Sequence, residues 1–121
     1  MDEVKGDLRV NSKDDFQRVN FYDNLAQAIR IRLMTAQGSL AMHPQYGSKL
    51  YQLLGTNPTD QTLILAKMHV KDALLQEPRV DSILKLTARF RDVLKNVIDI
   101  ELQVQPIKSL EPLDMVYSVF V

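Results

Sequence analysis

The sequence predicts an α+β fold in which helices pack on one face of a small antiparallel β-sheet. Two stretches before residue 77 carry apolar residues at three- and four-residue spacing, which is the repeat of an amphipathic helix. From residue 80 onward apolar and polar residues alternate, which is the repeat of a strand with one buried face. The segment Glu77-Pro78-Arg79 stands between the two patterns and is expected to form the corner between a helical half and a sheet half.

Length and composition restrict what kind of protein this is. A chain of 121 residues predicts one domain, residues 1–121, and its 45% hydrophobic and 25% charged residues are an ordinary globular mixture. The chain has no cysteine, which excludes disulfides and thiolate metal sites. Fifteen basic and fifteen acidic residues cancel, so the net charge gives no reason to expect nucleic acid as the main partner.

The sequence also gives no sign of a membrane or secretion segment. No run of about 20 apolar residues is present to span a bilayer. Residues 1–6 lack the basic-then-apolar order of a signal peptide. We therefore expect a soluble protein that is made and used in the cytoplasm, without a membrane partner.

The first helix is expected from Tyr22 to Gln37. Before it, residues 7–10 predict a brief edge strand and residues 11–15 a turn. The apolar stripe of the helix consists of Leu25, Ala28, Ile29, Leu33 and Ala36. Arg30 and Arg32 are expected in solvent, with a second, partner-binding face of the helix as the alternative.

The stretch after this helix contains three residues that force turns, namely Gly38, Pro44 and Gly47. Gly38 is expected to end the helix, and Tyr46 is expected to seat the turn against the core. We interpret Gly38, Pro44, Tyr46 and Gly47 as residues that shape the fold. His43 stands alone beside Pro44 and is interpreted as a loop residue rather than a ligand or a base.

The second helix is expected from Pro58 to Gln76. Asn57 can cap it, and Asp60 places a negative charge near the positive end of the helix dipole. Its apolar stripe consists of Leu63, Ala66, Val70, Ala73 and Leu74. Pro78 ends the helix, because the residue before a proline avoids the helical conformation and proline has no N–H to donate.

Two alternating stretches then predict an antiparallel hairpin with one buried and one solvent-exposed face. The buried face is expected to carry Leu84, Leu86, Ala88 and Phe90 from the first stretch and Ile98, Ile100, Leu102 and Val104 from the second. On the exposed face, cross-strand charge pairs are expected among Lys85, Arg89, Asp99 and Glu101. Ile83 and Val97 also fall on the exposed face in this pattern.

Residues 113–121 predict a last strand that is apolar on both sides. Leu113, Met115, Tyr117, Val119 and Val121 fill one face. Val116 and Phe120 make the other face apolar too. Such a strand either lies in the middle of the sheet or forms an edge that meets another protein. In the second case a foreign strand is expected to pair beside Tyr117, Val119 and Val121.

No constellation of residues for catalysis, a cofactor or a metal emerges from the sequence. A glycine-rich phosphate loop and a nucleophile elbow are absent, and His43 and His69 lie on separate predicted elements. Carboxylate pairs, which a glycosidase needs, can be chosen freely among 15 acidic residues and therefore carry little information. We expect no catalytic, cofactor-binding or metal-binding site and no small-molecule substrate.

Two motifs of the sequence stand out together. The first is the turn His43-Pro44-Gln45-Tyr46-Gly47-Ser48-Lys49-Leu50, preceded by Gly38-Ser39-Leu40. The second is the corner Glu77-Pro78-Arg79-Val80 at the end of a long predicted helix. Both resemble motifs of the baseplate wedge and sheath-initiator family of contractile phage tails. With the strand hairpin that follows, the resemblance covers residues 7–107. The family includes the type VI secretion baseplate component TssE, and an anti-adaptor of bacterial stress signalling resembles it in fold.

The resemblance implies a structural protein that lies in the tail baseplate of a virion or tail-like particle, beneath the first ring of tail sheath. The implied partners are baseplate wedge proteins and the tail sheath protein. Glu77, Pro78 and Arg79 are expected to contact a wedge protein, with an internal Glu77–Arg79 pair as the alternative. The alternative functions are a tail-associated muramidase-like glycoside hydrolase and a regulatory binding module like the anti-adaptor.

Overall fold

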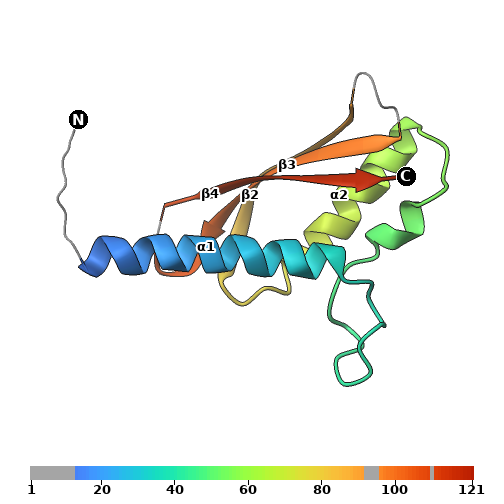
Figure 1. Ribbon diagram of the computed structural model, residues 1–121. Helices are drawn as coiled ribbons and strands as arrows, with labels where there is room; N and C mark the ends of the chain where they lie inside the picture. The colour runs from blue at the N-terminus through green and yellow to red at the C-terminus, as the bar shows by residue number, and fades with distance from the viewer. Residues whose placement is uncertain (1–12, 92–95, 110) are drawn as a thin grey trace.

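The computed structural model describes residues 13–91, 96–109 and 111–121, and it confirms the predicted α+β fold. Two helices pack against a three-stranded antiparallel sheet (Figure 1). The elements are α1 (Lys13–Met34), η1 (Leu50–Leu53), α2 (Asp60–Leu74), β2 (Val80–Phe90), β3 (Val97–Pro106), η2 (Ile107–Ser109) and β4 (Leu113–Phe120). The edge strand expected at residues 7–10 lies outside the described residues.

Helix α1 both begins and ends earlier than the sequence predicted. The turn expected at residues 11–15 is wrong for its described part, because residues 13–15 belong to the helix. Four apolar residues at four-residue spacing, Phe21, Leu25, Ile29 and Leu33, run along the side that meets the core. The helix stops at Met34 because the next residues pair with the following loop, through a parallel bridge between Ala36 and Ser48.

Helix α2 is shorter at both ends than the expected 58–76. Thr59, not Asn57, is its N-cap, and the Thr59 side chain accepts a hydrogen bond from the Thr62 N–H. Asp60 lies in the first turn, as expected, and places its charge at the positive end of the dipole. The buried side includes Ala66, Val70, Ala73 and Leu74 from the predicted stripe, together with Thr62 and His69.

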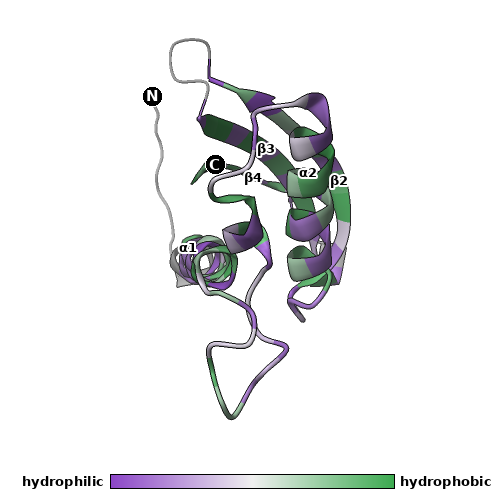
Figure 2. Ribbon diagram, turned by 90° about the vertical axis from the view of Figure 1, so that its right-hand side faces the viewer, coloured by the Kyte–Doolittle hydropathy of each residue, from purple (hydrophilic) through white to green (hydrophobic). Residues whose placement is uncertain are grey.

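The sheet has one apolar face, and both helices contribute to the core on that face. The strand order is β2-β3-β4, so β3 is central and pairs antiparallel with both neighbours. The core cluster contains residues from α1, α2 and all three strands: Leu25, Ile29, Leu33, Leu50, Leu53, Ala66, Val70, Ala73, Leu74, Val80, Ile98, Ile100, Leu102, Val104, Met115 and Val119. Figure 2, which views α1 end on, shows α2 beside the same sheet.

The alternation in β2 departs from prediction at one point. A register shift between Ile83 and Lys85 leaves Leu84 without a partner on β3. Ile83 therefore packs against the core, and Leu84, expected to be buried, is half exposed. Val97 was also expected on the exposed face, but it is buried.

Charged residues on the outer face of the sheet pair across the strands. Nζ of Lys85 lies 3.8 Å from Oε1 of Glu101, as the sequence predicted. Asp99 accepts hydrogen bonds from Arg91 Nη2 at 2.8 Å and from the Ser118 hydroxyl at 2.7 Å. These contacts join β3 to β4 and to the residue that follows β2. They hold the pKa of Asp99 down, to about 2, mainly through the Arg91 hydrogen bond.

Strand β4 lies at the edge of the sheet, which excludes the alternative that the last strand lies in its middle. Among the described residues no strand pairs with its outer side. The Val121 N–H donates to the Asn96 carbonyl at 2.9 Å, and the β3–β4 register is uninterrupted. Because antiparallel strands bond in alternate pairs, Met115, Tyr117 and Val119 also direct their backbone groups toward β3. The residues between them direct theirs away from the sheet: Asp114, Val116, Ser118 and Phe120.

Candidate functional site

The corner after α2 contains a buried carboxylate held by two arginines. The Glu77 side chain is only 4% exposed, and Glu77 is the one buried carboxylate among the described residues. Arg79 Nε donates to Glu77 Oε2 at 2.9 Å, and the Arg79 backbone N–H donates to the same oxygen at 3.4 Å. Arg32 Nη2, from α1, lies 3.4 Å from Oε1. The corner is therefore fastened both within itself and to the first helix.

The two arginines reverse the effect of burial on the Glu77 carboxyl. Burial is the largest influence and by itself raises the pKa, because it penalises the charged form. The hydrogen bonds from Arg79 and the charges of Arg79 and Arg32 together outweigh it, so the pKa of Glu77 lies below its ordinary value. Glu77 is thus a fixed anion, which suits a structural or recognition role.

Arg32 is the residue of this site that sequence reasoning missed, since it was expected in solvent. Its side chain is 12% exposed, and its guanidinium carbon lies 4.5 Å from the centre of the Tyr46 ring. Tyr46 therefore covers Arg32 and is not part of the hydrophobic core cluster. The available signal was that Arg32 directly precedes the buried Leu33, at the border of the apolar stripe. Arg32 connects the turn to the Glu77 corner.

The turn itself is fastened to the end of α1 through Gly47 and Ser48. Gly47 is buried with φ of +110°, and a Cβ there would collide with the Thr35 carbonyl oxygen. The Ser48 N–H donates to that carbonyl at 2.9 Å, and its hydroxyl donates to the Leu33 carbonyl at 2.8 Å. Only a residue without a side chain lets the two backbones approach this closely.

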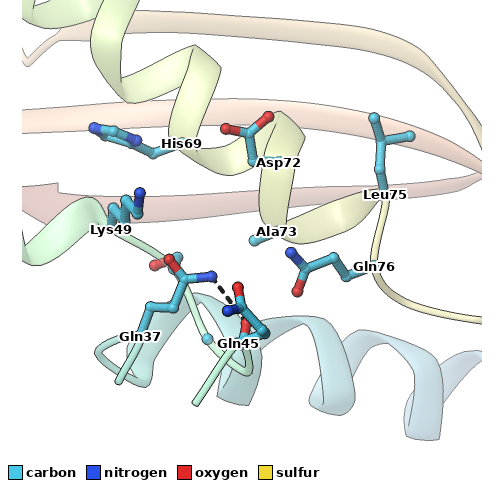
Figure 3. A pocket seen from close by; sticks show the side chains of 10 residues that line it. Gln37, Gln45, Lys49, His69, Asp72, Ala73, Leu75 and Gln76 are labelled. Carbon is cyan, nitrogen blue, oxygen red and sulfur yellow. Dashed lines mark hydrogen bonds between the residues drawn. The ribbon is translucent and has the colours of Figure 1, made fainter. Parts of the chain in front are cut away.

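Two hollows lie on either side of Gln45 in the turn and Gln76 after α2. One, of about 320 Å³, lies between α2 and the loop after α1. Figure 3 shows Gln37, Gln45 and Lys49 on the loop side of this hollow and His69 and Asp72 on α2. The other, of about 350 Å³, is lined by Arg32, Met42, His43, Pro44, Gln45, Tyr46 and Gln76. His43 is exposed on this loop, which projects from the body in Figure 1. Gln45 and Gln76 border both hollows.

The predicted interface residues of the last strand point mostly inward. Val119 is buried, and Tyr117 and Val121 pack against the core from the edge. Burial raises the pKa of Tyr117, partly offset by the nearby charge of Arg30 on α1. The expectation that a foreign strand pairs beside these three residues stays a prediction, but their side chains pack against the core and leave such a strand mainly the backbone of the edge. The exposed apolar side chains of the edge are Val116, at 58%, and Phe120, at 65%.

The described residues offer little for other kinds of site. No group of histidine and acidic side chains among them could hold a metal ion. No helix in the described part of the chain is long and apolar enough to cross a membrane. A third hollow, on the outer face of the sheet, has both Glu101 and Asp114 in its lining. Both residues are partly or fully exposed, and Glu101 is paired with Lys85.

Comparison with known proteins gives consistent matches. The family model of the contractile injection system sheath initiator matches residues 1–108. A candidate tail lysozyme from Geobacter sulfurreducens is 27% identical, with a TM-score of 0.72 over 94% of this chain and 96% of that one. A chain of the baseplate complex from the type VI secretion system is 21% identical, with a TM-score of 0.62 over 90% of this chain and 100% of that one, a likeness of fold. A comparison with curated protein sequences gave no significant match.

Proposed function

Because the chain belongs to the sheath-initiator family of contractile injection systems, we propose that it joins baseplate wedge proteins to the first ring of tail sheath and templates that ring. The family and the type VI baseplate neighbour support the coarser statement, that it is a structural baseplate component. The proposal adds two contacts: the β4 edge for a sheath strand and the Glu77 corner for a wedge protein. It includes no catalytic role.

Within residues 13–91, 96–109 and 111–121 no strand pairs with the outer edge of β4, and this observation carries the proposal. Val116, Ser118 and Phe120 direct their N–H and C=O groups away from the sheet, which makes a template for a strand of another chain. The segment 115–121 contains no charged residue and no proline, the usual devices that keep an edge unpaired. Val116 and Phe120 supply apolar contacts on the outer face for the added strand.

A pair of proline substitutions tests this contact. Val116→Pro removes an N–H that points outward, and proline is tolerated at such edge positions, so the fold is expected to persist. Tyr117→Pro removes an N–H that points to β3 and is expected to unfold the strand. We expect Val116→Pro protein to enter baseplates that then fail to start sheath, seen by electron microscopy. Normal sheath on such baseplates would overturn the templating role.

The corner can serve a partner because Glu77 does not depend on Arg79 alone. Arg32 approaches the carboxylate from the other side, so Glu77 keeps a cation if Arg79 turns outward. Arg79 is partly exposed, and its guanidinium fork suits a carboxylate or backbone carbonyls of a wedge protein. We expect Arg79→Ala to remain folded and to fail in wedge assembly, measured by co-purification with the wedge proteins. A folded Arg79→Ala protein that assembles normally would remove Arg79 from the interface.

The muramidase-like alternative has one observation in its favour, the hollow shared by Glu101 and Asp114, together with the tail-lysozyme description of a structural relative. A general acid needs apolar surroundings that keep it protonated, and these exposed side chains lack them. We expect the purified protein to release no soluble muropeptides from cell walls. Release that is lost in Glu101→Gln and Asp114→Asn would establish the enzyme instead.

The regulatory alternative makes a different demand. An anti-adaptor-like module would bind a stress-signalling protein and would not enter tail particles. The identity of the neighbouring genes distinguishes the two functions, and we expect these neighbours to be tail genes. Residence among stress regulators would favour the regulatory module.

A further inference from the structure

The two edges of the sheet differ in how they are protected against pairing with another chain. Strand β2, at one edge, carries the charged residues Asp81, Lys85 and Arg89 and two register shifts, which are features that discourage an added strand. Strand β4, at the other edge, has an uninterrupted register and a single charged residue, Asp114. The only charge of β4 therefore lies on the edge that is proposed to receive a sheath strand.

A strand edge without charges does not fix the register of the strand that joins it. Residues 115–121 are uncharged, so a partner strand could slip along them by two residues and keep its side chains on the same face. A template for a ring needs every copy to pair in the same register. Asp114 stands at one end of the edge and Phe120, which is 65% exposed, at the other. Because the two ends differ in chemistry, a strand with a matching charge at one end has one favoured position.

Asp114 is oriented to meet a residue of the added strand. Its N–H and C=O groups belong to the set that points away from β3, so a partner residue would lie directly opposite it, with the two Cα atoms about 5.5 Å apart. Its side chain is exposed. In the part of the chain that the structure describes, no cation lies within ion-pair distance of the Asp114 carboxylate. Asp114 therefore offers an unpaired carboxylate to a neighbouring strand.

The hollow beside Asp114 has room for a long side chain. It has a volume of about 400 Å³, and its lining includes Lys85, Glu101 and Val116 together with Asp114. Two carboxylates and one ammonium group give this hollow a net negative charge, since Lys85 pairs with Glu101 only. Val116, which is 58% exposed, can pack against the aliphatic stem of a lysine or arginine. The combination of an unpaired carboxylate and an apolar wall fits a basic side chain.

We propose that Asp114 sets the register of the sheath strand on β4 by pairing with a lysine or arginine directly opposite it. Counted along the added strand from that basic residue, the second and sixth residues lie opposite Val116 and Phe120 and are expected to be apolar. The inference rests on the proposed function, because it takes the added strand from the sheath protein. It gives a role to Asp114 and to the hollow beside it, which the templating contact alone does not use.

Charge reversal at Asp114 tests the pair. We expect Asp114→Lys to fold like the wild type and to enter baseplates normally, because the side chain is exposed and no ion pair of the described residues is lost. The fraction of these baseplates that carry sheath, counted by electron microscopy, is expected to fall at least tenfold, because a lysine opposite a basic residue repels the strand. Asp114→Glu keeps the charge and is expected to retain sheath. Asp23→Lys, the same reversal at an exposed aspartate of α1, is the matched control and leaves the fraction unchanged.

Restoring the pair identifies the partner residue. Among sheath variants that change one basic residue at a time to glutamate, we expect one to restore sheath on Asp114→Lys baseplates. The chain has no cysteine, so disulfides can then measure the register. The identified sheath position, changed to cysteine, is expected to join Asp114→Cys and not Val116→Cys, because residues offset by two along the strands lie too far apart for a disulfide. No rescue by any single variant, or a disulfide with Val116→Cys instead, would overturn the proposal.

The same variants separate this inference from the proposed function. If Asp114→Lys baseplates start sheath normally and Val116→Pro still blocks it, the charge pair is wrong and the template on β4 stands. If Val116→Pro also starts sheath normally, the template itself is wrong. Unfolding of Asp114→Lys would equally contradict the proposal, because the proposal requires an aspartate that the domain itself does not need.

Discussion

Arg32 near the end of α1 reaches Glu77 at the corner after α2, with Nη2 3.4 Å from Oε1, although 45 residues separate them. The contact connects the two motifs of the sequence, because Arg32 also lies under the Tyr46 ring of the turn. Arg32 Nε is buried and has no hydrogen-bond partner among the described residues. The hydrogen-bonding capacity of the Arg32 guanidinium is therefore only partly used. Glu77 lies closer to Arg79, at 2.9 Å, than to Arg32. A small movement of Glu77 toward Arg32 would shorten this contact.

The first prediction compares the members of this cluster. Glu77→Ala leaves two guanidinium groups without their carboxylate, and we expect a loss of about 3–5 kcal/mol in the free energy of unfolding. Arg79→Ala leaves the Glu77–Arg32 contact, and we expect about 1–3 kcal/mol. Urea unfolding at neutral pH measures both, with Lys85→Ala as a control for an exposed pair. Equal losses in the two variants would mean that Arg32 does not hold Glu77.

The second prediction concerns acid. The pKa values of Glu77 and Asp99 are lower in the folded chain than when unfolded, so both groups contribute fully to stability above about pH 5. The contribution is lost as the pH falls through the folded-state value, which for Asp99 is about 2. We expect the free energy of unfolding to decrease from pH 5 to pH 2, and to decrease less in Asp99→Asn and Glu77→Gln. Parallel curves for wild type and both variants would contradict the folded-state pairing.

The third prediction separates two glycines with positive φ. Gly38→Ala meets open space and suffers only backbone strain, roughly 1–2 kcal/mol. Gly47→Ala adds a collision with the Thr35 carbonyl and is expected to lose distinctly more. Thermal unfolding of the two variants is the measurement. If the melting temperature of Gly47→Ala equals or exceeds that of Gly38→Ala, the turn does not approach the Thr35 carbonyl as closely as the structure shows.

The fourth prediction concerns the end of the chain. Deleting residues 115–121 removes Met115 and Val119 from the core and exposes one side of β3. At about 1.5–3 kcal/mol for each buried side chain, we expect the truncated protein to be unfolded by circular dichroism. A folded truncation product would show that β4 adds little to the core. The proline pair at positions 116 and 117 is therefore the sharper way to examine the edge.

Much of the fold follows from local patterns in the sequence. The alternation of residues 98–104 places their apolar side chains on one face, as observed, because side-chain direction in a strand has a period of two. Pro78 was expected to end the second helix at Gln76, but α2 already ends at Leu74, before the proline can act on it. The position of Val116 and Phe120 on the face opposite Met115 and Val119, and the Lys85–Glu101 pair, also follow from periodicity.

Only the tertiary structure decided the features that depend on which distant segments meet. Because of the register shift at Leu84, Ile83 packs against the core and Leu84 is exposed, the reverse of the expectation. The shift arises from pairing with β3, so the local sequence pattern does not predict it. The edge position of β4 follows from the order of the strands in the sheet. Which of its backbone groups point outward follows from the hydrogen bond between Val121 and Asn96, because hydrogen-bonded pairs alternate along an antiparallel ladder. From the local sequence, Arg32 is an ordinary charged helix residue that is expected in solvent. Burial against Glu77 and Tyr46 gives it a structural role, because a charge is placed by partners that the local sequence does not contain.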